Sequence, residues 1–189
     1  DKPGDRKIIG NSLARLQYGF TMNFDYCGFD VSAFFQGTGN HYWYPSSGSF
    51  AFWGPFCQPM TSYMPKNFLD NCWDYNNTDA YFPRAVAYYA YSNGAQLYRT
   101  NTRYLQNVRY LRFKNLSVGY TIPKVITKKM GMEVVRIYFT GENIAYWSPL
   151  KKHSKYIDPE GALNRKSNVN DRAFYPWQKS YMFGLDITF

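Results

Sequence analysis

The clearest pattern along the chain is a strict alternation of apolar and polar residues near its start. Even positions from Leu16 to Tyr26 are apolar or aromatic, and the odd positions between them are polar or glycine. Because side chains of a β-strand alternate between two faces, this segment predicts a strand over residues 15–27. Its ten residue steps, tilted by about 40°, give an apolar stripe about 25 Å tall, the height of the apolar band of an outer-membrane barrel.

Four later segments alternate in the same way, which predicts an all-β, antiparallel protein. Cys27-Gly28 is expected to form a tight turn, so that the first two strands make a hairpin. The alternation stumbles near Asn115, which predicts a bulge. Pro123 and Gly131 are expected to begin and end a short helical connection. The later strands are predicted over residues 29–36, 104–122, 133–141 and 177–189.

Two long segments without periodicity separate these strands, over residues 37–103 and 142–176. The connections between strands therefore alternate between short and long. Outer-membrane barrels have short periplasmic turns and long extracellular loops, so this order favours a transmembrane β-barrel whose two long segments are extracellular. On this interpretation apolar side chains face lipid, and inward ones such as Asn23, Asp25, Arg136 and Thr140 face the interior.

Composition narrows the class of protein. Aromatic residues make up 21% of the 189 residues, which excludes a disordered chain. No run approaches the roughly 18 consecutive apolar residues of a membrane-spanning helix. The 22 basic and 13 acidic residues give a net charge of +9, but the basic residues are scattered along the chain, so no nucleic-acid partner is predicted.

Several segments resemble the C-terminal part of the SusC/RagA family, which are TonB-dependent outer-membrane transporters of Bacteroidota. They occur in the family's order over nearly the whole chain. The segments are Ile8 to Ser12, Gly28 to Gly37, Tyr110 to Pro123, Gly141 to Ile144, Asp158 to Glu160, and Tyr175 to Phe189.

The resemblance implies a 22-stranded barrel with an N-terminal plug, a segment that contacts the TonB complex, and a SusD-like surface lipoprotein that acts as a lid. Residues 1–189 would supply the last five or so strands, and the plug domain is absent from this chain. The family imports nutrients across the outer membrane with energy from TonB. An oligosaccharide is the first expectation for the nutrient and an oligopeptide the alternative.

Two groups of aromatic residues are candidates for function. Aromatic side chains of the first long segment could stack on a sugar or a peptide, or could instead pack within the loop. These candidates are Tyr42, Trp43, Tyr44, Trp53 and Phe56. By family resemblance, the alternating residues at the chain's end form the signal that the barrel-assembly machinery recognises. These are Tyr181, Phe183, Leu185, Ile187 and Phe189.

No catalytic motif is present, and the chain is not expected to be an enzyme or to hold a cofactor. His41 and His153 are far apart without a second ligand at helical spacing, so a histidine metal site is not expected. Oxygen ligands for calcium are weakly suggested in the first long segment, although the Gly and closing Glu of an EF-hand are missing. The residues concerned are Asp70, Asp74, Asn76 and Asp79.

Two hypotheses remain open at this stage. Cys57 and Cys72 both lie in the first long segment, where a disulfide would close a loop of about 15 residues and contribute about 3 kcal/mol, while Cys27 is a third candidate for pairing. The rival to the transporter is a soluble, aromatic-rich β-module that binds glycans. Extraction distinguishes the two, because only a barrel requires detergent.

Overall fold

The computed structural model describes residues 7–60, 64, 66–90, 97–154, 157–163 and 177–189. The chain divides into two compact units. The sheet unit comprises residues 14–40, 109–148 and 176–189, and the loop unit comprises residues 1–13, 41–108 and 149–175.

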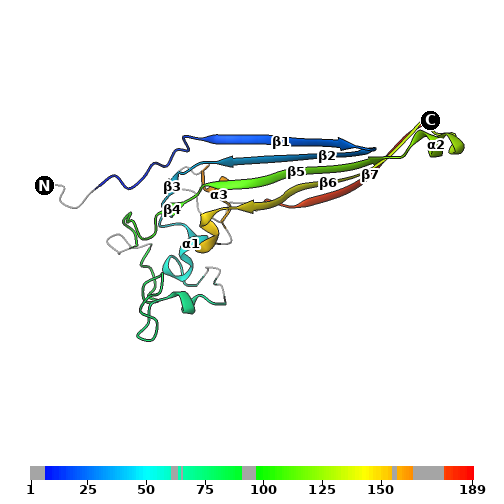
Figure 1. Ribbon diagram of the computed structural model, residues 1–189. Helices are drawn as coiled ribbons and strands as arrows, with labels where there is room; N and C mark the ends of the chain where they lie inside the picture. Colours follow the sequence, from blue (N-terminus) through cyan, green and yellow to red (C-terminus); the bar gives the residue numbers. More distant parts are fainter. Residues whose placement is uncertain (1–6, 61–63, 65, 91–96, 155–156, 164–176) are drawn as a thin grey trace. The chain divides into compact units, whose positions relative to one another are not determined.

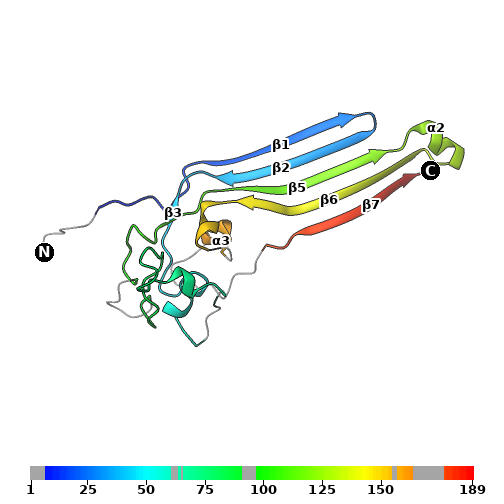
Figure 2. The ribbon, with the colours of Figure 1, turned by 60° about the horizontal axis from the view of Figure 1, so that its bottom comes forward.

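The sheet unit is one sheet of five long antiparallel strands, as the alternation predicted. Their order across the sheet is β1-β2-β5-β6-β7, so strands that are consecutive within the sheet unit are also neighbours in space. Figures 1 and 2 show the five strands side by side. The strands are β1 Gln17–Tyr26, β2 Phe29–Thr38, β5 Tyr110–Thr121, β6 Val134–Trp147 and β7 Ser180–Thr188.

The predicted hairpin turn between β1 and β2 is confirmed. Cys27 and Gly28 have φ angles of 47° and 86°. Positive φ at both central residues is the requirement of the two-residue turn that matches the twist of a hairpin. Gly28 is also needed sterically, because a Cβ there would lie 2.8 Å from the backbone oxygen of Thr121 on β5. The turn therefore fits closely against the next strand.

The bulge predicted near Asn115 is also confirmed. Phe34 and Phe35 of β2 pair with Asn115 and Phe113, so Lys114 is left out of the register. On the other side of β5 the pairing with β6 shifts at the same place, where Asn143 adopts a φ of 50°. The extra residue restores the alternation, so that Phe113 and Leu116 lie on the same face of the sheet.

The connection between β5 and β6 is a short helical turn, as predicted. It consists of α2 Lys124–Thr127 and the 3-10 helix η3 Lys128–Met130. Pro123 precedes the first turn, and Gly131 ends the helix in the left-handed conformation with φ 73°. The buried Thr127 hydroxyl lies 3.4 Å from the carbonyl oxygen of Glu133 and joins the helix to the start of β6.

Three predicted strand limits were wrong. Residues 104–109 do not extend β5, because Gln106–Asn107 forms a separate short strand, β4. Strand β6 continues to Trp147, so residues 142–147 belong to the sheet and not to a long loop. The left-handed Asn143 interrupts the alternation there, which hid the end of the strand. Strand β7 begins at Ser180 and ends at Thr188, one residue before the end of the chain.

The loop unit has its own hydrophobic core, whereas the sequence predicted a loop without regular structure. Short elements surround a cluster of buried aromatic and aliphatic residues. They are β3 Tyr42–Trp43, α1 Phe50–Trp53, η1 Gly54–Phe56, η2 Leu69–Asn71, β4 Gln106–Asn107, η4 Pro149–Lys152 and α3 Pro159–Leu163. The core contains Phe50, Phe52, Trp53, Phe56, Cys57, Phe68, Cys72, Phe82, Ala90, Leu97, Tyr104, Val108, Leu150, Ile157 and Ala162.

Candidate functional site

One face of the five-stranded sheet is apolar from edge to edge. The register brings the apolar residues of each strand opposite those of the next strand, so that they form continuous rows. The row residues on the two edge strands, together with Phe29 and Ile137, are exposed, and nearly all of the others are half-buried. The rows are Tyr26–Phe29–Tyr120–Ile137–Leu185, Phe24–Val31–Val118–Phe139–Phe183, Met22–Ala33–Leu116–Gly141–Tyr181 and Phe20–Phe35–Phe113–Ala145.

Aromatic stacking joins neighbouring strands within these rows. The ring of Phe35 lies 4.9 Å from that of Phe20 and 4.5 Å from that of Phe113, nearly parallel to both. The Phe139 and Phe183 rings are 5.0 Å apart on β6 and β7. Because such cross-strand pairs contribute to sheet stability, the apolar face also helps to fix the register.

The opposite face of the sheet is polar near the hairpin end. Asn23, Asp25, Arg136 and Thr140 all lie on this face, as their positions in the alternation predicted. Asn23 accepts a hydrogen bond of 2.8 Å from the Ser32 hydroxyl on β2. The sheet thus separates an apolar surface from a hydrogen-bonding one.

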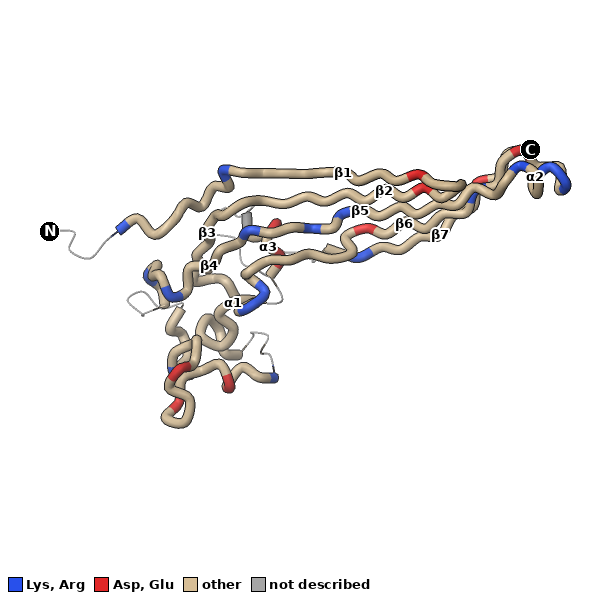
Figure 3. Tube along the Cα trace, viewed as in Figure 1, with Lys and Arg blue, Asp and Glu red and all other residues tan. Residues whose placement is uncertain are grey.

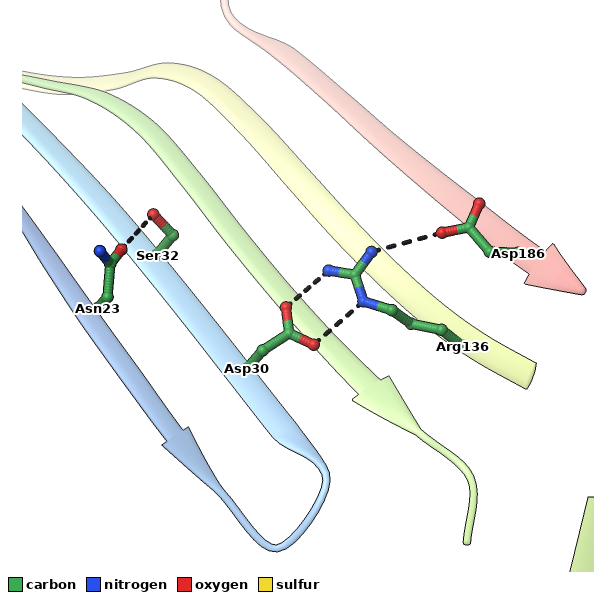
Figure 4. Close-up of polar contacts among 5 residues, drawn as sticks. All are labelled: Asn23, Asp30, Ser32, Arg136 and Asp186. Atoms are coloured by element: carbon green, nitrogen blue, oxygen red, sulfur yellow. Dashed lines mark hydrogen bonds and ion pairs between the residues drawn. The ribbon is translucent and has the colours of Figure 1, made fainter. Parts of the chain in front are cut away.

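Three charged side chains on the polar face form a network across four strands (Figure 4). Arg136 on β6 donates to both carboxylate oxygens of Asp30 on β2, at 3.1 and 2.6 Å. It also donates to Asp186 on β7 at 3.4 Å. Gly119 of β5 lies beneath the pair, and a Cβ there would overlap Asp30 Oδ1 and come 2.7 Å from Arg136 Nη2. The missing side chain lets the two charges meet above β5.

A second cation lies among aromatic rings at the other end of the same face. The guanidinium carbon of the buried Arg112 is 5.1 Å from the ring centroid of Tyr146 and 5.6 Å from that of Trp177. Lys114, the residue in the bulge, places its ammonium nitrogen 4.3 Å from the centroid of Trp177. Asn143 donates to the Gln178 carbonyl oxygen at 3.1 Å and so holds the chain that carries Trp177.

Two of the five aromatic residues that the sequence proposed for ligand stacking are completely enclosed in the loop unit. Trp53 has no exposed surface, and Phe56 has almost none. The Trp53 indole donates to the Ser46 carbonyl oxygen at 3.0 Å and packs edge-on against Tyr104. The proposal that these two residues stack on a ligand was therefore wrong, because their faces are used in the core.

The other three candidates, Tyr42, Trp43 and Tyr44, are half-buried. Tyr42 and Trp43 pair with Asn107 and Gln106 of β4. The Tyr44 hydroxyl donates to the carbonyl oxygens of Leu97 and Arg99, at 3.0 and 2.9 Å. Burial raises the pKa of Tyr44 well above its usual value. These residues hold the loop unit together, and each keeps some exposed surface.

Sequence analysis missed a hydrogen-bonded group around Tyr81. The Tyr81 hydroxyl receives a 2.8 Å hydrogen bond from Gln106, and the Arg103 guanidinium donates to the Tyr81 carbonyl oxygen at 3.1 Å. The ring of His153 stacks on Tyr81 at 3.7 Å between centroids. Burial raises the pKa of Tyr81 to about 12 and lowers that of His153. Nothing in the residue spacing could indicate this contact, because His153 is far away in the sequence.

An exposed ring at the tip of a turn, Tyr75, was also missed. Tyr75 is 78% exposed, and its ring lies 5.3 Å from that of Trp73. Backbone hydrogen bonds between Asp74 and Asn77, at 3.3 and 2.9 Å, close the turn. Tyr75 therefore offers a larger accessible ring surface than Tyr42, Trp43 or Tyr44, which are half-buried like Trp73.

The structure also bears on the cysteines and on calcium. All three cysteines lie within the described residues and all are free thiols, so the disulfide between Cys57 and Cys72 was wrong. The Cys57 thiol instead donates to the Ser47 carbonyl oxygen.

No cluster of three His, Cys, Asp or Glu side chains that could hold a metal ion occurs in the described part of the chain. The calcium candidates Asp70, Asp74, Asn76 and Asp79 thus gain no support.

The residues proposed as an assembly signal all lie at the edge of the sheet unit. Tyr181, Phe183 and Leu185 belong to the apolar rows, Ile187 pairs with Val135 on the same face, and Phe189 follows the strand. All five are exposed. Among the described residues, β7 has a strand partner on one side only.

In the described residues the fold is mostly antiparallel β-sheet, and the helices are short. In the described residues, no helix combines the length and apolar character needed to cross a membrane.

Two curated proteins are similar in sequence to this chain. The chain is 29% identical to TonB-dependent receptor P3 of Formosa agariphila and 27% identical to TonB-dependent receptor P26 of the same organism. Each match covers 98% of this chain. These matches cover only 17% and 18% of the two relatives, so the chain corresponds to a small part of each. No family model matches the chain.

Solved structures show the same fold. The RagAB peptide importer matches in its open-open state with a TM-score of 0.64 at 22% identity, over 94% of this chain and 17% of that one. Its closed-closed state matches with a TM-score of 0.65 at 21% identity, over 97% and 18%. The resemblance to TonB-dependent receptors of the SusC/RagA kind is therefore confirmed.

Proposed function

We propose that this chain supplies five neighbouring strands of an outer-membrane β-barrel that imports a nutrient. The observation that carries the proposal is the set of continuous apolar rows, which are exposed on one face of the sheet while ion pairs and hydrogen bonds occupy the other. A sheet with this division suits a barrel whose outside contacts lipid and whose inside is polar. The remaining strands of a 22-stranded barrel, and its plug, would belong to the rest of the full-length protein.

The lengths of the connections between strands indicate which end of the proposed barrel faces the periplasm. The two short turns, at Cys27-Gly28 and at α2–η3, leave one end of the sheet. The segments of the loop unit leave the other end, after Thr38 and after Trp147. Because outer-membrane barrels have short turns on the periplasmic side, we assign the α2 end to the periplasm and the loop unit to the cell exterior.

The proposed substrate is an oligosaccharide that enters from the exterior. Exposed rings such as Tyr75 provide flat apolar surface with little side-chain entropy to lose, which suits stacking on a sugar. An oligopeptide is the second candidate, favoured by the shared fold with the RagAB peptide importer. In either case the chain binds and conducts its substrate without changing it chemically, so we do not assign it an enzymatic activity.

We further propose two partners. The TonB complex would act through the missing N-terminal part of the protein and supply energy for import. A SusD-like lipoprotein would cover the extracellular side, in line with the RagAB fold relationship.

The test of this function uses the full-length protein in its native host. We expect it to fractionate with outer membranes, to require detergent for extraction, and to support uptake of a labelled oligosaccharide only when TonB is present. Recovery of the full-length protein in the soluble fraction would contradict the proposal and favour the glycan-binding module. Uptake of labelled peptides, but not of oligosaccharides, would keep the transporter and change its substrate.

A further inference from the structure

The helical turn between β5 and β6 has a composition unlike that of an ordinary solvated turn. Residues 123–132 contain three lysines and no acidic residue. Lys124, Lys128 and Lys129 are all exposed. Figure 3 shows these basic positions gathered at the α2 end of the sheet. We call residues 123–131 the lysine turn.

Three large apolar side chains of the lysine turn are exposed together with the lysines. Val125 is 76% exposed, Ile126 53% and Met130 66%. Of the helical residues 124–130, only Thr127 is buried, and its contacts with Lys124 and Glu133 fix the helix on the start of β6. Solvation explains exposed lysines, but it does not explain three exposed aliphatic or thioether side chains within one short connection.

The position of the turn relative to the apolar rows supplies the second observation. The row nearest the hairpin turn begins with the aromatic residues Tyr26, Phe29 and Tyr120, and the Phe29 and Tyr120 rings are 4.5 Å apart. Aromatic residues gather at the two membrane–water interfaces of a barrel. The lysine turn begins at Pro123, three residues after Tyr120 of this row, and Figure 1 shows α2 beyond that end of the strands. With the sheet in the proposed membrane location, the turn would lie at the level of the lipid headgroups.

We propose that the lysine turn is a binding site for the phosphate headgroups of phospholipids in the leaflet at the periplasmic end. This inference rests on the proposed membrane location of the sheet. The lysine ammonium groups bind the phosphates, while Val125, Ile126 and Met130 enter the boundary with the acyl chains. Basic side chains next to apolar ones are the combination that binds such an interface, and each lysine near an anionic surface strengthens binding about fivefold.

The experiment uses the full-length transporter, purified in a neutral detergent, with dioleoylphosphatidylglycerol as the probe. The melting temperature is followed as the lipid is titrated into the micelles. We expect the lipid to raise it, and the triple variant Lys124→Gln, Lys128→Gln, Lys129→Gln to need at least tenfold more lipid for the same shift. The matched control removes three exposed lysines elsewhere, Lys66, Lys152 and Lys179, and should respond like the unmodified protein.

Additional titrations determine which chemical group is bound. Dioleoylphosphatidylcholine, which has no net charge, should give a smaller shift, and 0.5 M salt should abolish the effect of the anionic lipid. An equal effect of inorganic phosphate would show a site for a free anion and overturn the lipid assignment. Equal responses of the triple variant and its control would overturn the site itself.

Two more variants keep the test decisive if the glutamine variant does not assemble. Replacement of the three lysines by arginine preserves the charge and should preserve the lipid response. Val125→Ser with Ile126→Ser should weaken that response although all three lysines remain. Loss of the response in the arginine variant would contradict the proposal. Absence of the unmodified protein from outer membranes would instead contradict the proposed function.

Discussion

Arg136 on β6 and Asp30 on β2 are joined by two hydrogen bonds although β5 lies between their strands. The closer bond, from Nη2 to Oδ2, is 2.6 Å long. The two side chains meet above Gly119 because that residue has no side chain to fill the space. Both charged side chains remain about one-third exposed, so the pair orients the strands more than it stabilises them.

Gly119→Ala should therefore separate Asp30 from Arg136. The new methyl group would overlap the ends of both side chains. Because these ends are partly exposed and can move aside, we expect only the loss of an exposed ion pair, about 0–1 kcal/mol. The measurement is the free energy of unfolding of the full-length protein in urea. Gly19→Ala is the control, because a Cβ at Gly19 has no neighbour closer than 3.4 Å.

The same substitution should cost less when Asp30 has already been replaced by alanine, because the clash with the carboxylate is gone. The two changes are expected to be non-additive, as is usual for residues in contact. Additive losses in a double-mutant cycle would show that Gly119 acts on the strand and not on the ion pair.

The network illustrates which features could be predicted from the sequence. Alternation is local, so it predicted the strands, the hairpin turn, the bulge and the face on which Arg136 lies. The partner of Arg136 could not be predicted, because Asp30 is 106 residues away and is brought near only by the register of β2, β5 and β6. The role of Gly119 depends on the same register.

The loop unit shows what could not be predicted where the sequence has no alternation. Trp53 and Phe56 lie in a segment without periodicity, so the sequence did not indicate which way their rings point. A signal was present in retrospect, because Phe50, Phe52, Trp53 and Phe56 occur within seven residues and the buried Cys57 follows. Such density of apolar residues is typical of a local core. It competes with the interpretation of loop aromatics as ligand contacts.

Met22→Arg should impair barrel formation far more than Asn23→Arg. Met22 belongs to the central apolar row and is exposed, whereas Asn23 lies on the polar face. A cation near the middle of the bilayer costs about 2–4 kcal/mol on the lipid side of a barrel. The readout is the amount of folded full-length protein in outer membranes. Equal losses from the two neighbouring substitutions would show that the faces have been assigned the wrong way round.

Thiol labelling should distinguish Cys27 from the other two cysteines. Cys27 is exposed at the hairpin turn, whereas Cys57 and Cys72 are buried as free thiols. At pH 8 we expect iodoacetamide to modify Cys27 in the folded protein and all three in denaturant, as counted by mass spectrometry. If Cys57 and Cys72 resist labelling even in protein that has been denatured without a reductant, the disulfide hypothesis would be restored.

The pKa of Cys72 adds a pH dependence. Burial raises this pKa from 9.0 to about 11, so the folded protein holds the thiol proton more tightly than the unfolded chain does. The resulting stabilisation is fully present below pH 9 and is lost as the pH rises toward 11. Cys72→Ala should therefore reduce the fall in melting temperature between pH 9 and pH 10.5. An identical fall in the variant would exclude Cys72 as its cause.

Phe189 should matter more for assembly than for the stability of the finished barrel. In the described part of the sheet, β1 and β7 each lack a partner on their outer edge, and an unpaired edge is costly in lipid. In the proposed barrel, β7 would therefore pair with another strand of the full-length protein, and its exposed residues from Tyr181 to Phe189 would be what the assembly machinery meets first. Deletion of Phe189, which is 87% exposed and outside the strand pairing, removes few contacts from the folded sheet. We expect this deletion to lower the amount of full-length protein in outer membranes several-fold, while the protein that does assemble keeps its melting temperature.

Phe189→Tyr, which preserves an aromatic side chain at this position, is the control and should assemble normally. Normal outer-membrane levels after the deletion would mean that Phe189 is not part of a recognition signal.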